Sequence, residues 1–74
     1  MLLADRIVVD ERIRFGKPVI RGTRVRVDLV LGKLAAGLTY DEVKAEYGLQ
    51  LEDILAVLDY AAKCISGEEV KAIA

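Results

Sequence analysis

Residues 39–58 read TYDEVKAEYGLQLEDILAVL, and this stretch predicts two helices joined by a tight turn. Thr39 and Glu42 have the spacing of a capping box, in which each side chain accepts a hydrogen bond from the other residue's free backbone amide, so the first helix begins there. Gly48 can adopt the positive φ that such a turn requires, and the second helix follows from Leu51. Two short helices with a glycine turn between them are typical of a helix-turn-helix.

The helical pattern continues on both sides of this stretch. Upstream, apolar residues at helical spacing predict a helix over residues 28–36, with Gly37 as its left-handed C-terminal cap. Downstream, seven apolar residues share one direction on the third helix and are expected to face the core: Leu51, Ile54, Leu55, Leu58, Ala61, Ala62 and Ile65. A second capping-box pattern at residues 66–69 predicts a short fourth helix.

The N-terminal part of the chain has the composition of β structure. Residues 7–9 are a β-branched triplet, and residues 18–27 have strand composition on both sides of Gly22, which predicts a short strand followed by a small hairpin or an extended arm. In the second half of that arm Arg24 and Arg26 occupy alternate positions and therefore share one exposed face.

These patterns together predict one domain over residues 1–74, divided into a basic β arm at 1–27 and a helical bundle at 28–74. The expected fold class is mainly α: a three- to four-helix helix-turn-helix bundle with a short N-terminal β strand or hairpin arm. Because a chain of 74 residues buries only about 60% of the surface that its unfolded form exposes, we also expect a homodimer.

The net charge of −1 hides a division along the chain. Residues 1–33 hold eight Lys and Arg against four Asp and Glu, a net +4, whereas residues 34–74 hold three against eight, a net −5. An anionic partner is therefore expected at the N-terminal part. The candidate contact residues are the cations of the arm: Arg12, Arg14, Lys17, Arg21, Arg24 and Arg26. The residues expected to shape the arm and the turns are Gly16, Pro18, Gly22, Thr23, Gly37 and Gly48.

Composition excludes several classes of function. The chain has no histidine and one cysteine, Cys64, so neither an internal disulfide nor a metal site is predicted, and no cofactor is expected. No nucleophile and base form a recognisable pair, and the acids fall where helix caps explain them, so an enzyme is not expected. The absence of a long apolar run and of a basic-then-apolar leader predicts a cytoplasmic protein that does not enter the membrane.

The third helix carries the wrong charge for reading DNA unaided. Glu52, Asp53 and Asp59 are predicted to point away from the core, where they would meet the phosphate backbone. An apolar stripe is predicted beside the core face, formed by Val57, Tyr60 and Cys64. The arm could cover this stripe, or the stripe could contact a second copy of the chain or another partner.

Residues 16–25 read GKPVIRGTRV and are the most distinctive part of the chain. With GLT at 37–39 and LEDI at 51–54, this segment resembles the family called domain of unknown function 433, over about residues 7–62. The resemblance implies a homeodomain-like or winged-helix-like fold and the role of an antitoxin encoded beside a PIN-like ribonuclease toxin. Three residues depart from the usual family pattern: Phe15, where a second Gly is common, Gly48 and Gln50.

Three functions stay open from the sequence. The first is an antitoxin module of a type II toxin-antitoxin pair, whose arm arginines enter the carboxylate cluster of a PIN-like ribonuclease and which also binds operator DNA. The second is a free-standing DNA-binding transcriptional regulator, in which the arm grips phosphates. The third is a protein-interaction domain with no nucleic-acid role. The arginines could also lie in solvent around a turn, where surface ion pairs contribute only ~0–1 kcal/mol.

Overall fold

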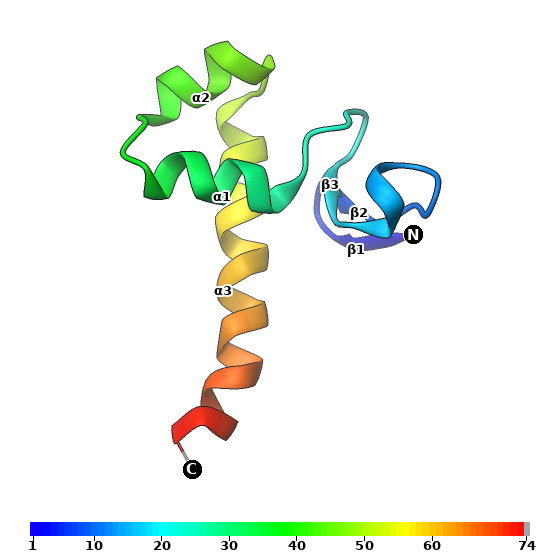
Figure 1. Cartoon of the computed structure of the whole chain (residues 1–74), viewed down its shortest axis with the longest axis vertical. Coiled ribbons are helices and arrows are strands. Elements are labelled where there is room, and N and C mark those ends of the chain that lie inside the picture. The colour runs from blue at the N-terminus through cyan, green and yellow to red at the C-terminus, as the bar shows by residue number, and fades with distance from the viewer. Residues whose placement is uncertain (74) are drawn as a thin grey trace.

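Three helices and a small antiparallel sheet make up the described part of the chain (Figure 1). The computed structural model describes the backbone of residues 1–73 and the side chains of residues 1–67. The elements in chain order are β1 (Leu2–Ala4), β2 (Ile7–Val8), the 3-10 turn η1 (Arg14–Gly16), β3 (Val19–Ile20), α1 (Val27–Ala35), α2 (Tyr40–Tyr47) and α3 (Leu51–Ile73). α1 and α2 lie against the first half of α3, and the sheet lies to one side of it. A mostly helical chain with an N-terminal β segment is therefore confirmed.

The helix ends around the central turn form as the sequence predicts. α1 is closed by Gly37, whose φ is 102° and whose amide donates to the Leu34 carbonyl (3.0 Å). The capping box of α2 is complete, because the Glu42 amide donates to Thr39 Oγ1 (3.1 Å) and the Thr39 amide donates to Glu42 Oε1 (2.9 Å). Gly48 ends α2 in the left-handed conformation, with a φ of 67°.

Replacing Thr39 by alanine is expected to lower the free energy of unfolding by about 1 kcal/mol, because the Glu42 amide loses the hydroxyl that accepts its hydrogen bond. Chemical denaturation followed by circular dichroism measures this loss. Thr39→Ser keeps the hydroxyl and is the matched control, which should retain the stability of the natural chain. Equal losses in both variants would contradict the capping role.

The N-terminal sheet has the strand order β1-β2-β3, and both pairs of strands are antiparallel. Ile7 pairs with Ile20 and Val8 pairs with Val19, so the β-branched segments meet in the sheet. The sequence does not predict β1, since Leu2–Ala4 contains no β-branched residue.

The hairpin or extended arm predicted at residues 18–27 forms only in part, because its second half is not a regular strand. Arg26 forms an isolated bridge with Val19, and Val27 already begins α1. The Val27 amide donates to the Pro18 carbonyl (3.0 Å), and the chain then turns away from the sheet into the helix. The arginines of this segment are therefore not aligned by a regular strand.

The core side of α3 also differs from the predicted one. Ile54 and Val57 are fully buried, whereas Leu51, Leu55 and Ile65 are 41, 48 and 61% exposed. The prediction is right for Ile54 but wrong for Leu51, Leu55 and Ile65. α3 packs against β2 as well as against α1 and α2, so the helix turns its Val57 side inward. The buried core joins the sheet to all three helices and consists of Ile7, Ile20, Val27, Val30, Val43, Leu49, Ile54 and Val57.

α3 continues without a break to Ile73, so the predicted separate fourth helix is wrong. Ser66 and Gly67 keep the helical conformation, and a capping pattern acts only where the chain enters a helix from a non-helical segment. Figure 1 shows the second half of α3 extending beyond the other elements. Within the part of the chain that the structure describes, no helix is both long and apolar enough to span a membrane.

Candidate partner-binding surface

Residues 20–25 form a turn that is held by its own threonine. The Thr23 hydroxyl donates to the Ile20 carbonyl (2.7 Å) and accepts from the Val25 amide (3.0 Å). The Ile20 amide in turn donates to the Val25 carbonyl (3.0 Å). Gly22 has a φ of 79°, a conformation in which a side chain would be strained. These contacts fix the backbone that carries one arginine on each side of the Gly-Thr pair.

Four cations of the arm form no ion pair with any described carboxylate: Arg14, Lys17, Arg21 and Arg24. All four are exposed. Arg14 Nε donates to the Arg24 carbonyl (3.2 Å), which ties η1 to the turn of residues 20–25. The arm therefore presents uncompensated positive charge to solvent, and a guanidinium in this state can bind a carboxylate or a phosphate through two parallel hydrogen bonds.

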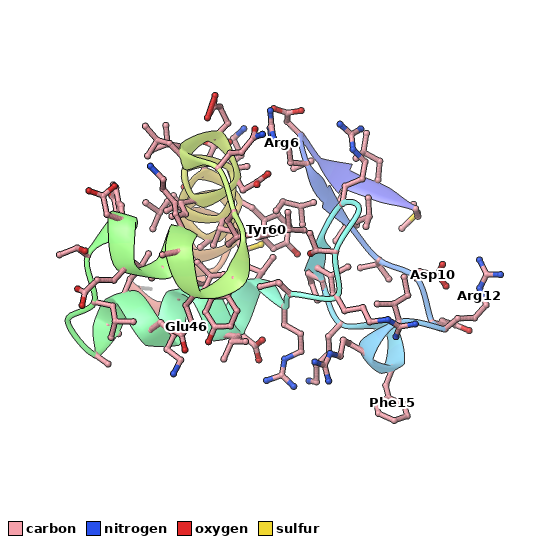
Figure 2. All side chains as sticks on the ribbon, turned by 90° about the horizontal axis from the view of Figure 1, so that it is seen from above. Arg6, Asp10, Arg12, Phe15, Glu46 and Tyr60 are labelled. Carbon is pink, nitrogen blue, oxygen red and sulfur yellow. The ribbon has the colours of Figure 1, made fainter. Side chains whose placement is uncertain are left out.

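Arg12 and Arg26 are also predicted contact residues, but each is paired within the chain. Arg26 Nε lies 2.9 Å from Asp28 Oδ1. Arg12 binds both oxygens of Asp10, with Nε 3.1 Å from Oδ1 and Nη2 3.0 Å from Oδ2, and Figure 2 shows this pair at the edge of the arm. Because each carboxylate offsets its arginine's charge, these two residues attract an anionic partner less than the other four do.

The Asp10 carboxyl should titrate far below the range of an ordinary aspartate. Hydrogen bonds from the side chain and then from the backbone of Arg12 lower the pKa of Asp10 from 3.8 to about 2. Because the folded pKa is the lower one, the pairing stabilises the fold above about pH 4 and is lost as the pH falls towards 2. NMR titration should return a midpoint near 3.8 in Arg12→Ala, and the same midpoint in the natural chain would contradict the pairing.

One ion pair that the sequence does not predict joins the sheet region to α3. Arg6 Nη1 lies 2.9 Å from Asp53 Oδ1, and the side chains are 32 and 13% exposed. The other Asp53 oxygen accepts the Gln50 amide (3.0 Å), and the Arg6 carbonyl accepts the Arg21 amide (2.7 Å). The prediction that Asp53 points away from the core is therefore wrong. The partners are 47 positions apart, so no local pattern indicates their contact.

The predicted apolar stripe is divided between the core and the surface. Val57 is completely buried, so it contributes to the core and is not available to a partner. Tyr60 is half-buried and Cys64 is exposed, and both line an open groove of about 400 Å³ between the arm, α1 and α3. The pKa of Tyr60 is raised, mainly by hydrogen bonding to the Cys64 thiol and to a smaller extent by partial burial.

A second, smaller hollow lies where the β1–β2 connection meets α3, and it is acidic. Its lining consists of Asp5, Glu52, Leu55, Ala56 and Asp59. Glu52 and Asp59 are exposed, so this side of α3 would present carboxylates to a phosphate backbone. Among the described residues no group of three or more His, Cys, Asp or Glu side chains is placed to hold a metal ion.

Comparison with known proteins identifies the family of the chain. Residues 7–61 match the family model described as "Protein of unknown function (DUF433)". The chain belongs to the DUF433 family. This DUF433 chain is similar to the Mycobacterium tuberculosis protein named "Putative antitoxin VapB45", with 41% identity over 56 residues, which cover 76% of the chain and 23% of the relative.

The DUF433 chain also resembles a solved structure, the X-ray crystal structure of RV2018 from Mycobacterium tuberculosis. The TM-score is 0.66 at 42% identity, over 72% of this chain and 25% of that one. The chain thus spans about a quarter of the length of the relatives that it matches. The family expected from residues 16–25 is confirmed, and the matched region contains both the turn of residues 20–25 and the core of the helices.

Proposed function

We propose that this DUF433 chain is the partner-binding module of an antitoxin, which acts by direct contact with a toxin protein and not by catalysis. A relative at 41% identity that is named an antitoxin supports this role. The observation that carries the proposal is the fixed turn of residues 20–25. It holds Arg21 and Arg24 exposed, and no described carboxylate pairs with either of them.

The geometry of the arm suits an acidic protein surface. A backbone that is already fixed loses little conformational entropy when a partner binds. Arg14 and Lys17 add positive charge beside the turn, because Arg14 is tied to it through the Arg24 carbonyl. At an interface from which water is excluded, such cations bind carboxylates more strongly than they do at an open surface.

The toxin that we propose is a PIN-like ribonuclease, the partner that the family resemblance implies. A nuclease of this kind holds its divalent metal in a cluster of carboxylates, which has the charge and the geometry to accept Arg21 and Arg24. Arginines that occupy those carboxylates displace the metal, and hydrolysis of RNA stops because the metal activates the reaction.

Operator DNA is the second candidate partner, because exposed arginines bind phosphates as well as carboxylates. In this hypothesis α2, the turn at Gly48 and α3 act as a helix-turn-helix, with α3 as the reading helix. The exposed Glu52 and Asp59 on α3 disfavour that docking. We therefore propose that the arm, and not α3, makes the DNA contacts.

Co-purification of the tagged chain with the product of the neighbouring gene tests the proposed function. The antitoxin role predicts a complex of fixed stoichiometry and loss of that protein's ribonuclease activity when the chain is added. Retention on DNA without such a complex would instead favour the transcriptional regulator. If the chain forms no complex and binds no DNA, both proposals are contradicted, and an interaction domain of another kind is favoured.

A further inference from the structure

Phe15 is the most exposed large hydrophobic side chain among the described residues. Its ring is 98% exposed and projects away from the arm (Figure 2). Its backbone nevertheless lies in the left-handed region, with a φ of 58°, where a residue with a side chain is strained. Among the described residues the ring packs against nothing that could offset the strain. A contact with another molecule would give the ring a role.

The backbone around Phe15 keeps the ring in this projecting position. The Gly16 amide donates to the Ile13 carbonyl (3.2 Å), and the Lys17 amide donates to the Arg14 carbonyl (3.2 Å). Arg14 has a positive φ as well, 52°, so the reversal of the chain is shared by consecutive residues. η1 is thus a hydrogen-bonded turn with an aromatic ring at its tip.

The groove beside η1 can accept such a ring. Its walls come from the arm, α1 and α3, and include Lys17, Pro18, Val27, Leu31, Ala61 and Cys64. An enclosed apolar cavity of ~150 Å³ holds a benzene molecule, so a groove of about 400 Å³ has room for a phenyl ring.

We propose that Phe15 of one copy of the chain seats in this groove of a second copy, and that the second copy returns the same contact. The groove begins at Lys17, two residues after Phe15, so the ring and its receptor are neighbours on each copy. A two-fold axis between two copies lets each ring enter the groove of the other copy, and this reciprocal contact closes a dimer.

The charges of the groove suit a second copy of the same surface. Lys17 lines it and has no ion pair with a described carboxylate, and Asp28 also lines it and binds Arg26 through Oδ1 only. A two-fold arrangement can place each Lys17 beside the second oxygen of Asp28 from the other copy. Arg21 and Arg24 do not line the groove. The contact of the ring with the groove therefore does not use these two arginines, and the dimer does not depend on the proposed toxin.

Sedimentation of the whole chain over a concentration series tests the dimer. Phe15→Gly should raise the dissociation constant ~1000-fold, since an aromatic hot spot contributes about 30-fold and a two-fold dimer seats two rings. Glycine adopts this φ without strain, so a thermal melt at a concentration where both chains are monomeric should show the variant at least as stable as the natural chain. Leu55→Ala, which removes an exposed apolar side chain outside the groove, is the control and should not change the dimer.

A second variant tests whether the groove is the site that receives the Phe15 ring. Ala61→Trp fills the groove and should abolish self-association while Phe15 stays in place. Mixing Ala61→Trp with Phe15→Gly leaves one ring and one open groove, so a heterodimer about 30-fold weaker than the natural dimer should form. A natural chain that stays monomeric at every concentration, or a dimer that Phe15→Gly does not weaken, would overturn the proposal.

Discussion

Ile54→Ala is expected to lower the free energy of unfolding by about 2–5 kcal/mol, because the Ile54 side chain is completely buried in the core cluster and leaves a cavity when it is shortened. The total stability of a 74-residue chain is about 4–11 kcal/mol. The variant should therefore unfold at much lower temperature and denaturant concentration. Thermal and chemical denaturation followed by circular dichroism measure both.

Leu55→Ala is the matched control for this experiment. It shortens the neighbouring residue of the same helix, but the Leu55 side chain is 48% exposed, so the loss should stay below about 1 kcal/mol. The sequence pattern predicts both residues on the core face, whereas the structure buries only Ile54. Equal losses at Ile54 and Leu55 would contradict the observed orientation of α3.

Structural features that depend on a few consecutive residues could be predicted from the sequence. The capping box at Thr39 and Glu42 and the reversals at Gly37 and Gly48 are confirmed, because each is completed by contacts within about five residues. The inward side of α3 could not be predicted, since helical periodicity does not record that β2 packs against this helix. The pair of Arg6 and Asp53 is missed for the same reason.

The candidate surface shows a similar limit. Its six cations could be identified from composition, but the division between paired and unpaired ones could not. Arg12 and Arg26 each bind a carboxylate two positions away. These contacts depend on the bend after β2 and on the start of α1, and a periodic pattern specifies neither. The exposure of Phe15 likewise follows from the positive φ of η1, a segment for which the sequence predicts no regular element.

The double variant Arg21→Ala, Arg24→Ala is expected to weaken binding of the toxin at least ~1000-fold. Loss of one partner from an ion pair buried at an interface costs about 2–5 kcal/mol, which is at least about 30-fold for each arginine. The fold should persist, because both side chains are exposed and neither makes a side-chain hydrogen bond within the described residues. Unfolding curves of the variant and the natural chain should therefore agree within about 0.5 kcal/mol.

Arg12→Ala, Arg26→Ala is the matched control, because it also removes two positive charges from the arm. These arginines already bind Asp10 and Asp28, so their removal should weaken the complex less than about tenfold. The comparison separates a specific contact from a general effect of net charge.

The central claim is that the turn of residues 20–25 binds the partner. It is tested most directly by calorimetric titration of the toxin with the natural chain and with both double variants. We expect tight binding by the natural chain, an affinity loss of less than about tenfold for Arg12→Ala, Arg26→Ala, and a loss of at least ~1000-fold for Arg21→Ala, Arg24→Ala. Equal affinity losses in the two double variants, or an undiminished affinity of Arg21→Ala, Arg24→Ala, would contradict it.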